Sequence, residues 1–128
     1  MLVQMCRAKI HRLTVTDRNV DYEGSITLDK LLLEESGILP YEKVQVANVT
    51  NGERFETYVM EGDRGKGDVC LNGAAAHLAE KGDIVIVIAY GEMEEKTAKT
   101  FKPKIVYVDG RNKIIQKSEI GCRMSEIG

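Results

Sequence analysis

The chain has 128 residues and a mass of 14.3 kDa, the size of a single domain, and 43% of its residues are hydrophobic and 30% charged. This composition excludes a disordered chain, and the longest unbroken apolar run, from Ile84 to Tyr90, is too short to span a membrane. Eighteen basic and twenty acidic side chains give a net charge of −2 without the basic stripe that is typical of nucleic-acid-binding proteins.

Cysteine and histidine, which often bind metals, are few and far apart. Cys6, Cys70 and Cys122 lack the close spacing of a zinc site, a redox dithiol or a disulfide scaffold, and so they indicate reduced, structural thiols. Neither His11 nor His77 has a cysteine or carboxylate at ligand spacing. Since no secretory signal is recognisable either, the sequence predicts a cytoplasmic protein without a metal site.

The first forty residues predict two strands and a short helix. Apolar and polar side chains alternate over residues 11–16, which is the period of a half-buried strand, and residues 26–28 read as a second extended segment. Asp29 can cap a helix over residues 31–35, and Gly37 would end that helix.

A hairpin is predicted next, followed by a loop. Residues 44–49 and 54–60 are expected as its two strands, and Asn51-Gly52 favours a tight turn in which both residues have positive φ. The glycine-rich, charged segment 61–68 is expected as a loop. Its glycine spacing fits neither a dinucleotide nor a phosphate fingerprint, so a turn is the better interpretation.

The rest of the chain predicts one short helix and further strands. Asn72 is expected to cap a helix over residues 73–81, and Gly82 to end it. Residues 83–90 are apolar on both faces, which indicates a strand within a barrel wall that packs against a neighbouring element or subunit. The remaining expectations are a charged connector (91–103), a strand (104–109), a turn at Asp109-Gly110, a last strand (113–116) and a flexible tail (117–128). Six or seven short strands with two short helices predict a closed β-barrel.

Four short segments, taken in order, carry a family resemblance. They are Lys9-Ile10-His11-Arg12, Tyr22-Glu23-Gly24-Ser25, residues 51–58 with the pattern Asn-Gly-x-Arg-Phe-x-Thr-Tyr, and Asn72-Gly73-Ala74-Ala75-Ala76-His77. In this combination the chain resembles the aspartate 1-decarboxylases, pyruvoyl-dependent enzymes that make β-alanine for pantothenate and coenzyme A. The resemblance extends from about residue 5 to about residue 116.

The resemblance implies a fold and an assembly. It implies a mainly β, double-psi β-barrel with short helices over residues 1–116, assembled as a homotetramer whose active sites lie between neighbouring subunits. It implies nothing about residues 117–128, and it leaves open whether a maturation partner is needed. The chain departs from the family pattern at Glu56, where a small hydroxyl residue is common.

The chemistry explains why a Gly-Ser pair matters. Loss of CO₂ from an amino acid leaves an electron pair on Cα that ordinary side chains cannot accept, and no pyridoxal-phosphate site is recognisable here. In the resembled family, Ser25 Oγ attacks the carbonyl carbon of Gly24, the chain breaks between these residues, and Ser25 becomes the pyruvoyl group that forms a Schiff base with the substrate. We expect Gly24 to adopt a strained backbone that a residue with a Cβ would not tolerate. Taken alone, Gly24-Ser25 would indicate a simple turn.

The resemblance also assigns roles to other residues. Tyr58 is the proton donor that returns a proton to Cα, and Thr57 holds the Gly24 carbonyl during self-cleavage and later contacts the substrate. His11 and Tyr22 line the cleavage site. Lys9 and Arg54 are candidates for binding the carboxylates of L-aspartate, because a cation, and above all the planar guanidinium fork, matches a carboxylate. The remaining substrate-binding residues are Asn72, Gly73, Ala74 and Ala75, where free amides at a helix start can bind an anion.

Each of these residues also has a plainer interpretation. Tyr58 alone would indicate a packed strand aromatic, Arg54 a solvated charge, and residues 73–75 a helix start that packs on the barrel through alanines. For the whole chain, the alternatives are a related decarboxylase for another amino acid and a non-catalytic, oligomeric β-barrel used for protein interaction or DNA binding.

Overall fold

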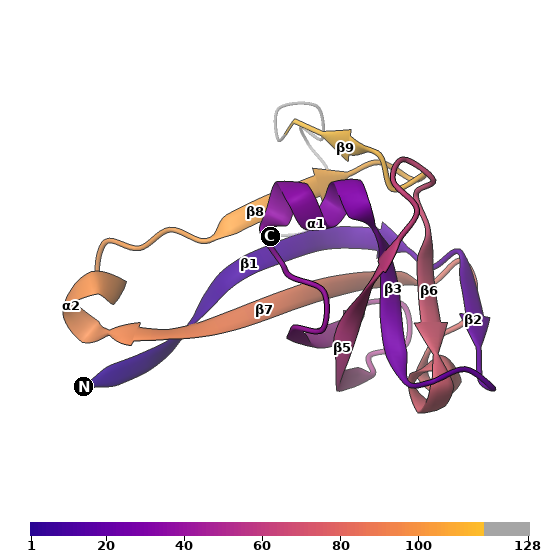
Figure 1. Ribbon diagram of the computed structural model, residues 1–128, viewed down its shortest axis with the longest axis horizontal. Coiled ribbons are helices and arrows are strands. Elements are labelled where there is room, and N and C mark those ends of the chain that lie inside the picture. The colour runs from indigo at the N-terminus through magenta and orange to yellow at the C-terminus, as the bar shows by residue number, and fades with distance from the viewer. Residues whose placement is uncertain (117–128) are drawn as a thin grey trace.

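The computed structural model describes residues 1–116, so the predicted tail 117–128 lies outside the described residues. Within residues 1–116 the structure has nine strands and three short helices (Figure 1). In chain order they are β1 (Leu2–Thr14), β2 (Asp17–Asn19), β3 (Ser25–Asp29), α1 (Lys30–Ser36), β4 (Lys43–Asn48), β5 (Arg54–Gly62), β6 (Val69–Asn72), the 3₁₀ helix η1 (Gly73–Leu78), β7 (Ile84–Glu94), α2 (Glu95–Ala98), β8 (Lys104–Val108) and β9 (Ile114–Ile115).

The strands form one curved sheet in the hydrogen-bonded order β2-β6-β3-β5-β4-β7-β1-β8-β9. The pairings β1–β8, β2–β6 and β3–β5 are parallel, and the other pairings are antiparallel. Asn112, between β8 and β9, joins the two ends of the order: its amide donates to the carbonyls of Thr14 and Gly67, each at 2.8 Å. Because Gly67 precedes β6, this contact draws the sheet around a common interior.

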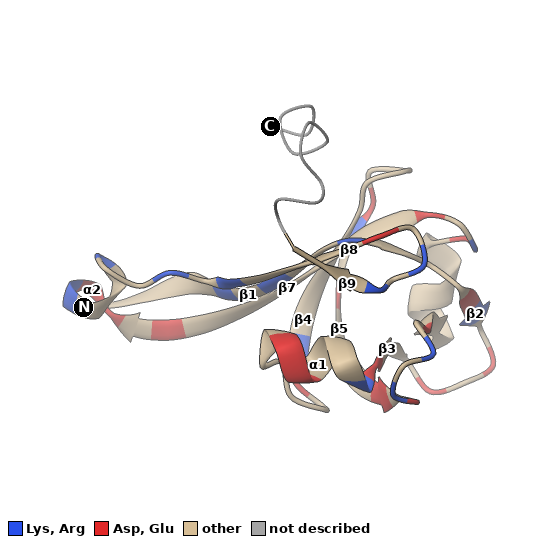
Figure 2. Cartoon of the chain, turned by 90° about the horizontal axis from the view of Figure 1, so that it is seen from above, with Lys and Arg blue, Asp and Glu red and all other residues tan. Residues whose placement is uncertain are grey.

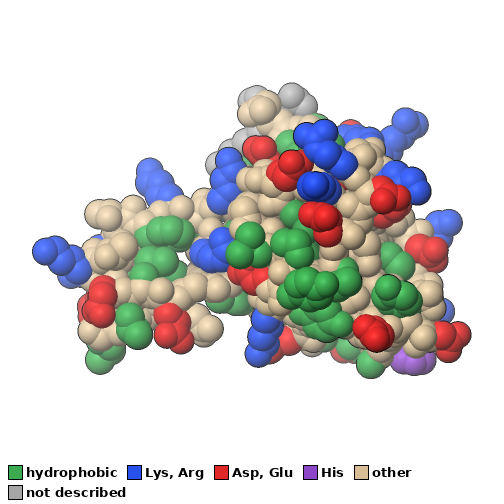
Figure 3. All heavy atoms as spheres, in the orientation of Figure 1, with side chains coloured by type: hydrophobic (Ala, Val, Ile, Leu, Met, Phe, Trp, Pro, Cys, Tyr) green, Lys and Arg blue, Asp and Glu red, His purple; other side chains and the backbone are tan. Residues whose placement is uncertain are grey.

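The interior is filled by aliphatic side chains from both halves of the chain. Fully buried members include Ile10 and Leu13 of β1, Ile26 of β3, Val59 of β5 and Val87 of β7. Beyond this core, the first half of β1 and the last half of β7 continue as a two-stranded arm that carries α2 at its tip (Figure 1). Basic and acidic residues are interspersed along the chain (Figure 2), and their side chains are mixed over the visible face (Figure 3). Within residues 1–116, no helix is long and apolar enough to cross a membrane.

The predicted α1 is confirmed, and one carboxylate fixes its start. Asp29 Oδ1 accepts the Leu31 N–H at 2.8 Å, and the αL residue Gly37 (φ 78°) ends the helix. The same buried carboxylate accepts the backbone N–H groups of Gly65 at 2.9 Å and Gly67 at 2.7 Å. Burial alone would raise the pKa of Asp29, but these three N–H donors and the charge of Lys113 hold that pKa below its ordinary value.

Several sequence expectations are wrong in detail. The connector predicted at 91–103 begins later, because residues 91–94 continue β7 and pair with the start of β1. Similarly, β5 extends to Gly62, and the short strands β2 and β6 were not expected. In the 48–53 turn only Gly52 (φ 82°) has positive φ, because the connection is longer than a two-residue turn. The helix expected over 73–81 is a 3₁₀ helix that ends at Leu78.

Candidate active site

Ser25 lies at the start of β3, with its side chain completely buried. Its hydroxyl accepts a hydrogen bond from Asn72 Nδ2 at 2.9 Å and donates to the Glu23 carbonyl at 3.4 Å. The pairing of β3 with β6 places Ser25 directly opposite Asn72. Asn72 therefore does not cap the helix that follows, as the sequence suggested: its side chain makes no cap hydrogen bond and instead holds the serine hydroxyl.

The backbone around Gly24 is crowded by Gly73. Gly73 has a φ of 65°, and a Cβ built on it would lie 2.6 Å from Gly24 Cα, 2.7 Å from Gly24 N and 2.9 Å from the Tyr22 carbonyl oxygen. The expected strain at Gly24 is not found, because its φ is outside the left-handed region and a Cβ there would meet nothing within 4 Å. Close backbone packing therefore requires a glycine at position 73 and not at position 24.

Thr57 and Tyr58 lie on β5, which runs parallel to β3 with Ile26 opposite Val59. Extended backwards by two positions, this register sets Thr57 level with Gly24, the residue just before β3. Val59 is buried in the core, and side chains alternate along a strand, so Thr57 shares the inward face and Tyr58 lies on the outward face.

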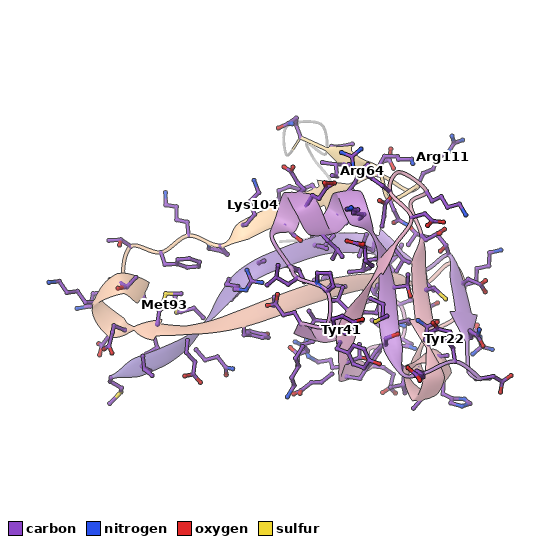
Figure 4. All side chains as sticks on the ribbon, in the orientation of Figure 1. Tyr22, Tyr41, Arg64, Met93, Lys104 and Arg111 are labelled. Atoms are coloured by element: carbon purple, nitrogen blue, oxygen red, sulfur yellow. The ribbon has the colours of Figure 1, made fainter. Side chains whose placement is uncertain are left out.

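Tyr58 is half-buried and stacks on Tyr41. The ring centroids are 6.5 Å apart, with 23° between the ring planes. Tyr41 lies in the loop between α1 and β4, beside β5 in Figure 4, and has a φ of 70°, which is unusual for a residue other than glycine. Its N–H donates to the Val59 carbonyl at 2.6 Å, which ties this loop to the strand that carries Tyr58.

Arg54 shares the outward face of β5 with Tyr58. It lies three residues before Thr57, about 10 Å along the strand, and its exposed guanidinium donates to Gln45 Oε1 at 3.0 Å. Tyr90 of β7 donates its hydroxyl to the same oxygen at 3.0 Å. Beside these groups is an open hollow of about 460 Å³, lined by Gln4, Lys43, Val44, Gln45, Glu56 and Tyr90.

Glu56, the position that departs from the family pattern, lies in this hollow. Its carboxylate forms an exposed ion pair with Lys43 Nζ at 2.6 Å, and Lys43 is the antiparallel partner of Tyr58. The substitution therefore changes the charge of the outward face and not the packing of the core. Gln45 and Lys43 were not singled out from the sequence, because only strand pairing places them beside Arg54 and Tyr58.

The other predicted residues lie at different places. Tyr22 contributes its carbonyl to the crowded backbone near Gly73, but the residue is 54% exposed; Figure 4 places it near the lower ends of β3 and β6. Lys9 and His11 belong to β1, which is four strands from β3 in the sheet order. His11 is buried with its ring edge-on to Tyr107, the centroids being 6.0 Å apart. Ala74 and Ala75 follow Gly73 in η1, where Ala74 is exposed and Ala75 half-buried.

Comparison with known proteins decides the family. A family model described as aspartate decarboxylase matches residues 1–115. The chain belongs to this family. Similar proteins named aspartate 1-decarboxylase occur in Pelotomaculum thermopropionicum (56% identity, covering 91% of this chain and 88% of that one) and Acetivibrio thermocellus (55%, covering 93% and 95%). A third, from Dehalococcoides mccartyi, is 50% identical and is matched over its whole length.

Among solved structures, a rationally designed protein, mkDPBB_sym_86, aligns with a TM-score of 0.51 and 23% identity, covering 66% of this chain and 96% of that chain. At this identity the likeness concerns the fold alone. It confirms the predicted mainly β, double-psi β-barrel for this aspartate decarboxylase family member. Among residues 1–116 no group of three His, Cys, Asp or Glu side chains is arranged to hold a metal ion.

Proposed function

We propose that this protein decarboxylates L-aspartate to β-alanine and CO₂ with a pyruvoyl group that it makes from its own Ser25. The observation that carries the proposal is the completely buried Ser25, which directly follows Gly24 and whose hydroxyl accepts a hydrogen bond from Asn72. Relatives of this chain are named aspartate 1-decarboxylase. The product would enter pantothenate and coenzyme A synthesis in the cytoplasm.

Self-cleavage begins at the Gly24-Ser25 peptide. Ser25 Oγ forms a bond to the Gly24 carbonyl carbon while the bond from that carbon to Ser25 N breaks, and the hydroxyl proton passes to the nitrogen. The new ester then loses the Ser25 Cα proton and breaks the Cβ–Oγ bond, which leaves Gly24 with a carboxylate. Addition of water to the remaining dehydroalanine releases ammonia. The buried hydroxyl and the inward-facing Thr57 support these assignments.

The pyruvoyl group supplies the carbonyl that accepts the electron pair left on Cα when CO₂ departs. In the proposal Tyr58 returns a proton to that carbon, which a phenol can do because the acceptor is strongly basic. Arg54 binds a substrate carboxylate through its bidentate fork, with Lys9 as a second cation. The site fits this chemistry because a completely buried serine directly follows Gly24 and because Gly73 packs closely against the Gly24 backbone.

Two features support a site completed by a neighbouring subunit in a homotetramer. Arg54 lies about 10 Å along β5 from Thr57, and Lys9 belongs to a strand four places away from β3, so one chain does not gather all the predicted binding residues around Ser25. The outer face of β7 is apolar, with Ile86 and Ile88 half-buried and Tyr90 40% exposed. Such a face is suited to burial against a second copy.

Intact-mass analysis of the purified protein tests the proposal. Wild type is expected as two pieces, residues 1–24 and 25–128, with a carbonyl in place of the α-amine on the larger piece. Ser25→Ala lacks the attacking oxygen, so it should remain one chain and produce no β-alanine from aspartate. A wild-type protein that is fully active as one uncut chain would overturn the pyruvoyl proposal. Efficient decarboxylation of alanine by the wild type would overturn the substrate assignment.

A further inference from the structure

Four side chains form a small polar cluster where β3 and β6 pair. Ser25 lies opposite Asn72, and Thr27 lies opposite Cys70, so the four face one another in two adjacent pairs. Asn72 Nδ2 donates to Ser25 Oγ at 2.9 Å and to Thr27 Oγ1 at 3.0 Å. At the other end of the amide, Cys70 Sγ donates to Asn72 Oδ1 at 3.3 Å.

The thiol is the member of this cluster that distinguishes the two ends of the amide. A hydroxyl both donates and accepts, so Ser25 and Thr27 could pair with either the oxygen or the nitrogen of Asn72. A thiol is weak both as donor and as acceptor, but Cys70 Sγ here donates to Asn72 Oδ1, and this contact favours the orientation with Oδ1 on the side of Cys70. That orientation leaves Nδ2 on the side of Ser25.

We propose that Cys70 is a positioning residue for self-cleavage, which it promotes by holding the Asn72 amide with its N–H groups toward Ser25 Oγ. The inference rests on the proposed self-cleavage at Gly24-Ser25. Burial, together with the nearby carboxylates of Asp17 and Asp68, raises the pKa of the Cys70 thiol. The thiol therefore keeps its proton at neutral pH, as a donor to Oδ1 must.

The orientation of the amide matters for the attacking oxygen. With Nδ2 as donor, Ser25 Oγ uses one lone pair for Asn72, directs its hydrogen to the Glu23 carbonyl and keeps a lone pair for the Gly24 carbon. As the hydroxyl loses its proton, the Nδ2 donor stabilises the charge that develops on Oγ. If the amide were reversed, Oδ1 would face Oγ, draw the hydroxyl hydrogen to itself and oppose that charge.

Three single variants test this role. Cys70→Val removes the donor, Cys70→Ser replaces it with a hydroxyl donor, and Cys6→Val makes the same change on β1, where Cys6 contacts the Ala8 carbonyl. The measurement is the rate of appearance of the 1–24 and 25–128 pieces by intact mass. We expect Cys70→Val to slow cleavage on the order of tenfold. This is less than the 10²–10³-fold cost of deleting a hydrogen-bond donor outright, because the Asn72 amide still visits the orientation with Nδ2 toward Ser25 Oγ. Cys70→Ser and Cys6→Val should remain within about threefold of wild type.

A double variant separates positioning from packing. Asn72→Asp has no N–H to direct at Ser25, so adding Cys70→Val to it should slow cleavage no further. If wild type cleaves and Cys70→Val cleaves as fast, or if Cys70→Ser is as slow as Cys70→Val, the positioning role is refuted. If wild type itself never cleaves, the proposed function fails first. Thermal melting of each variant in the uncut Ser25→Ala background checks the fold, and Cys70→Ala replaces the valine variant if that variant does not melt cooperatively.

Discussion

Gly73→Ala is expected to destabilise the protein and to slow its self-cleavage. Two costs add at this position. An L-residue at a φ of 65° costs about 1–2 kcal/mol, and a Cβ only 2.6 Å from Gly24 Cα forces backbone shifts that cost about 1–3 kcal/mol more. The expected loss is therefore about 2–5 kcal/mol, a large part of the 5–15 kcal/mol that stabilises a typical domain.

Gly52→Ala is the matched control for backbone strain alone. Gly52 has a φ of 82°, and a Cβ built on it would meet nothing within 4 Å, so this variant should lose only about 1–2 kcal/mol. Urea unfolding of both variants in the Ser25→Ala background, at one protein concentration, compares uncut chains. Gly73→Ala should have the lower midpoint, by roughly 1 M for a difference of about 2 kcal/mol.

The cleavage rate gives an independent readout of the same contact. The added methyl group pushes on Gly24 N and Cα, and Gly24 carries the carbonyl that Ser25 attacks. In the cleavable protein, Gly73→Ala should therefore slow formation of the 1–24 piece, whereas Gly52→Ala should not. Equal midpoints and equal cleavage rates for the two variants would refute the close approach of Gly73 to Gly24.

Three further predictions concern turnover and stability. Tyr58→Phe should still self-cleave but decarboxylate aspartate roughly 10²–10⁴-fold more slowly, the usual contribution of a positioned general acid, and near-normal turnover would remove Tyr58 from its role. Arg54→Lys should self-cleave yet lose about 1–3 kcal/mol of transition-state binding, measured as kcat/KM for aspartate; an unchanged value would make Arg54 a solvated strand charge. Asp29→Asn should lower the free energy of unfolding by about 1–3 kcal/mol at pH 7. The pKa of Asp29 is lower in the folded than in the unfolded state. The stabilisation by its carboxylate is therefore complete above the unfolded-state pKa, near 3.9, and is lost as the pH falls through the folded-state pKa. The gap between the wild-type and Asp29→Asn proteins should thus close in acid, and a gap that is constant with pH would contradict the assigned carboxylate.

Sequence patterns were sufficient to predict the elements whose causes are local. Alternation and β-branched residues predicted the main strands, and Asp29 as the cap with Gly37 as the stop predicted α1, because caps and periodicity act within a few residues. The family resemblance was also carried by short contiguous segments, and the match over residues 1–115 confirms it. The predicted roles of the site residues stay predictions.

Contacts between side chains on different strands could not be predicted from the sequence, because they depend on how the strands pair. Asn72 was expected to cap a helix by its position in the sequence, but the β3–β6 pairing places it against Ser25 and gives its amide a buried hydroxyl to hold. Gly24 was expected to be the strained glycine. Instead η1 approaches the Tyr22–Gly24 backbone so closely that Gly73 is the position where a Cβ would clash. The residues that contact Asn72, Tyr58 and Arg54 are Cys70, Tyr41 and Gln45. The sequence did not predict these contacts, because strand register determines which side chains become neighbours and sequence periodicity does not specify that register.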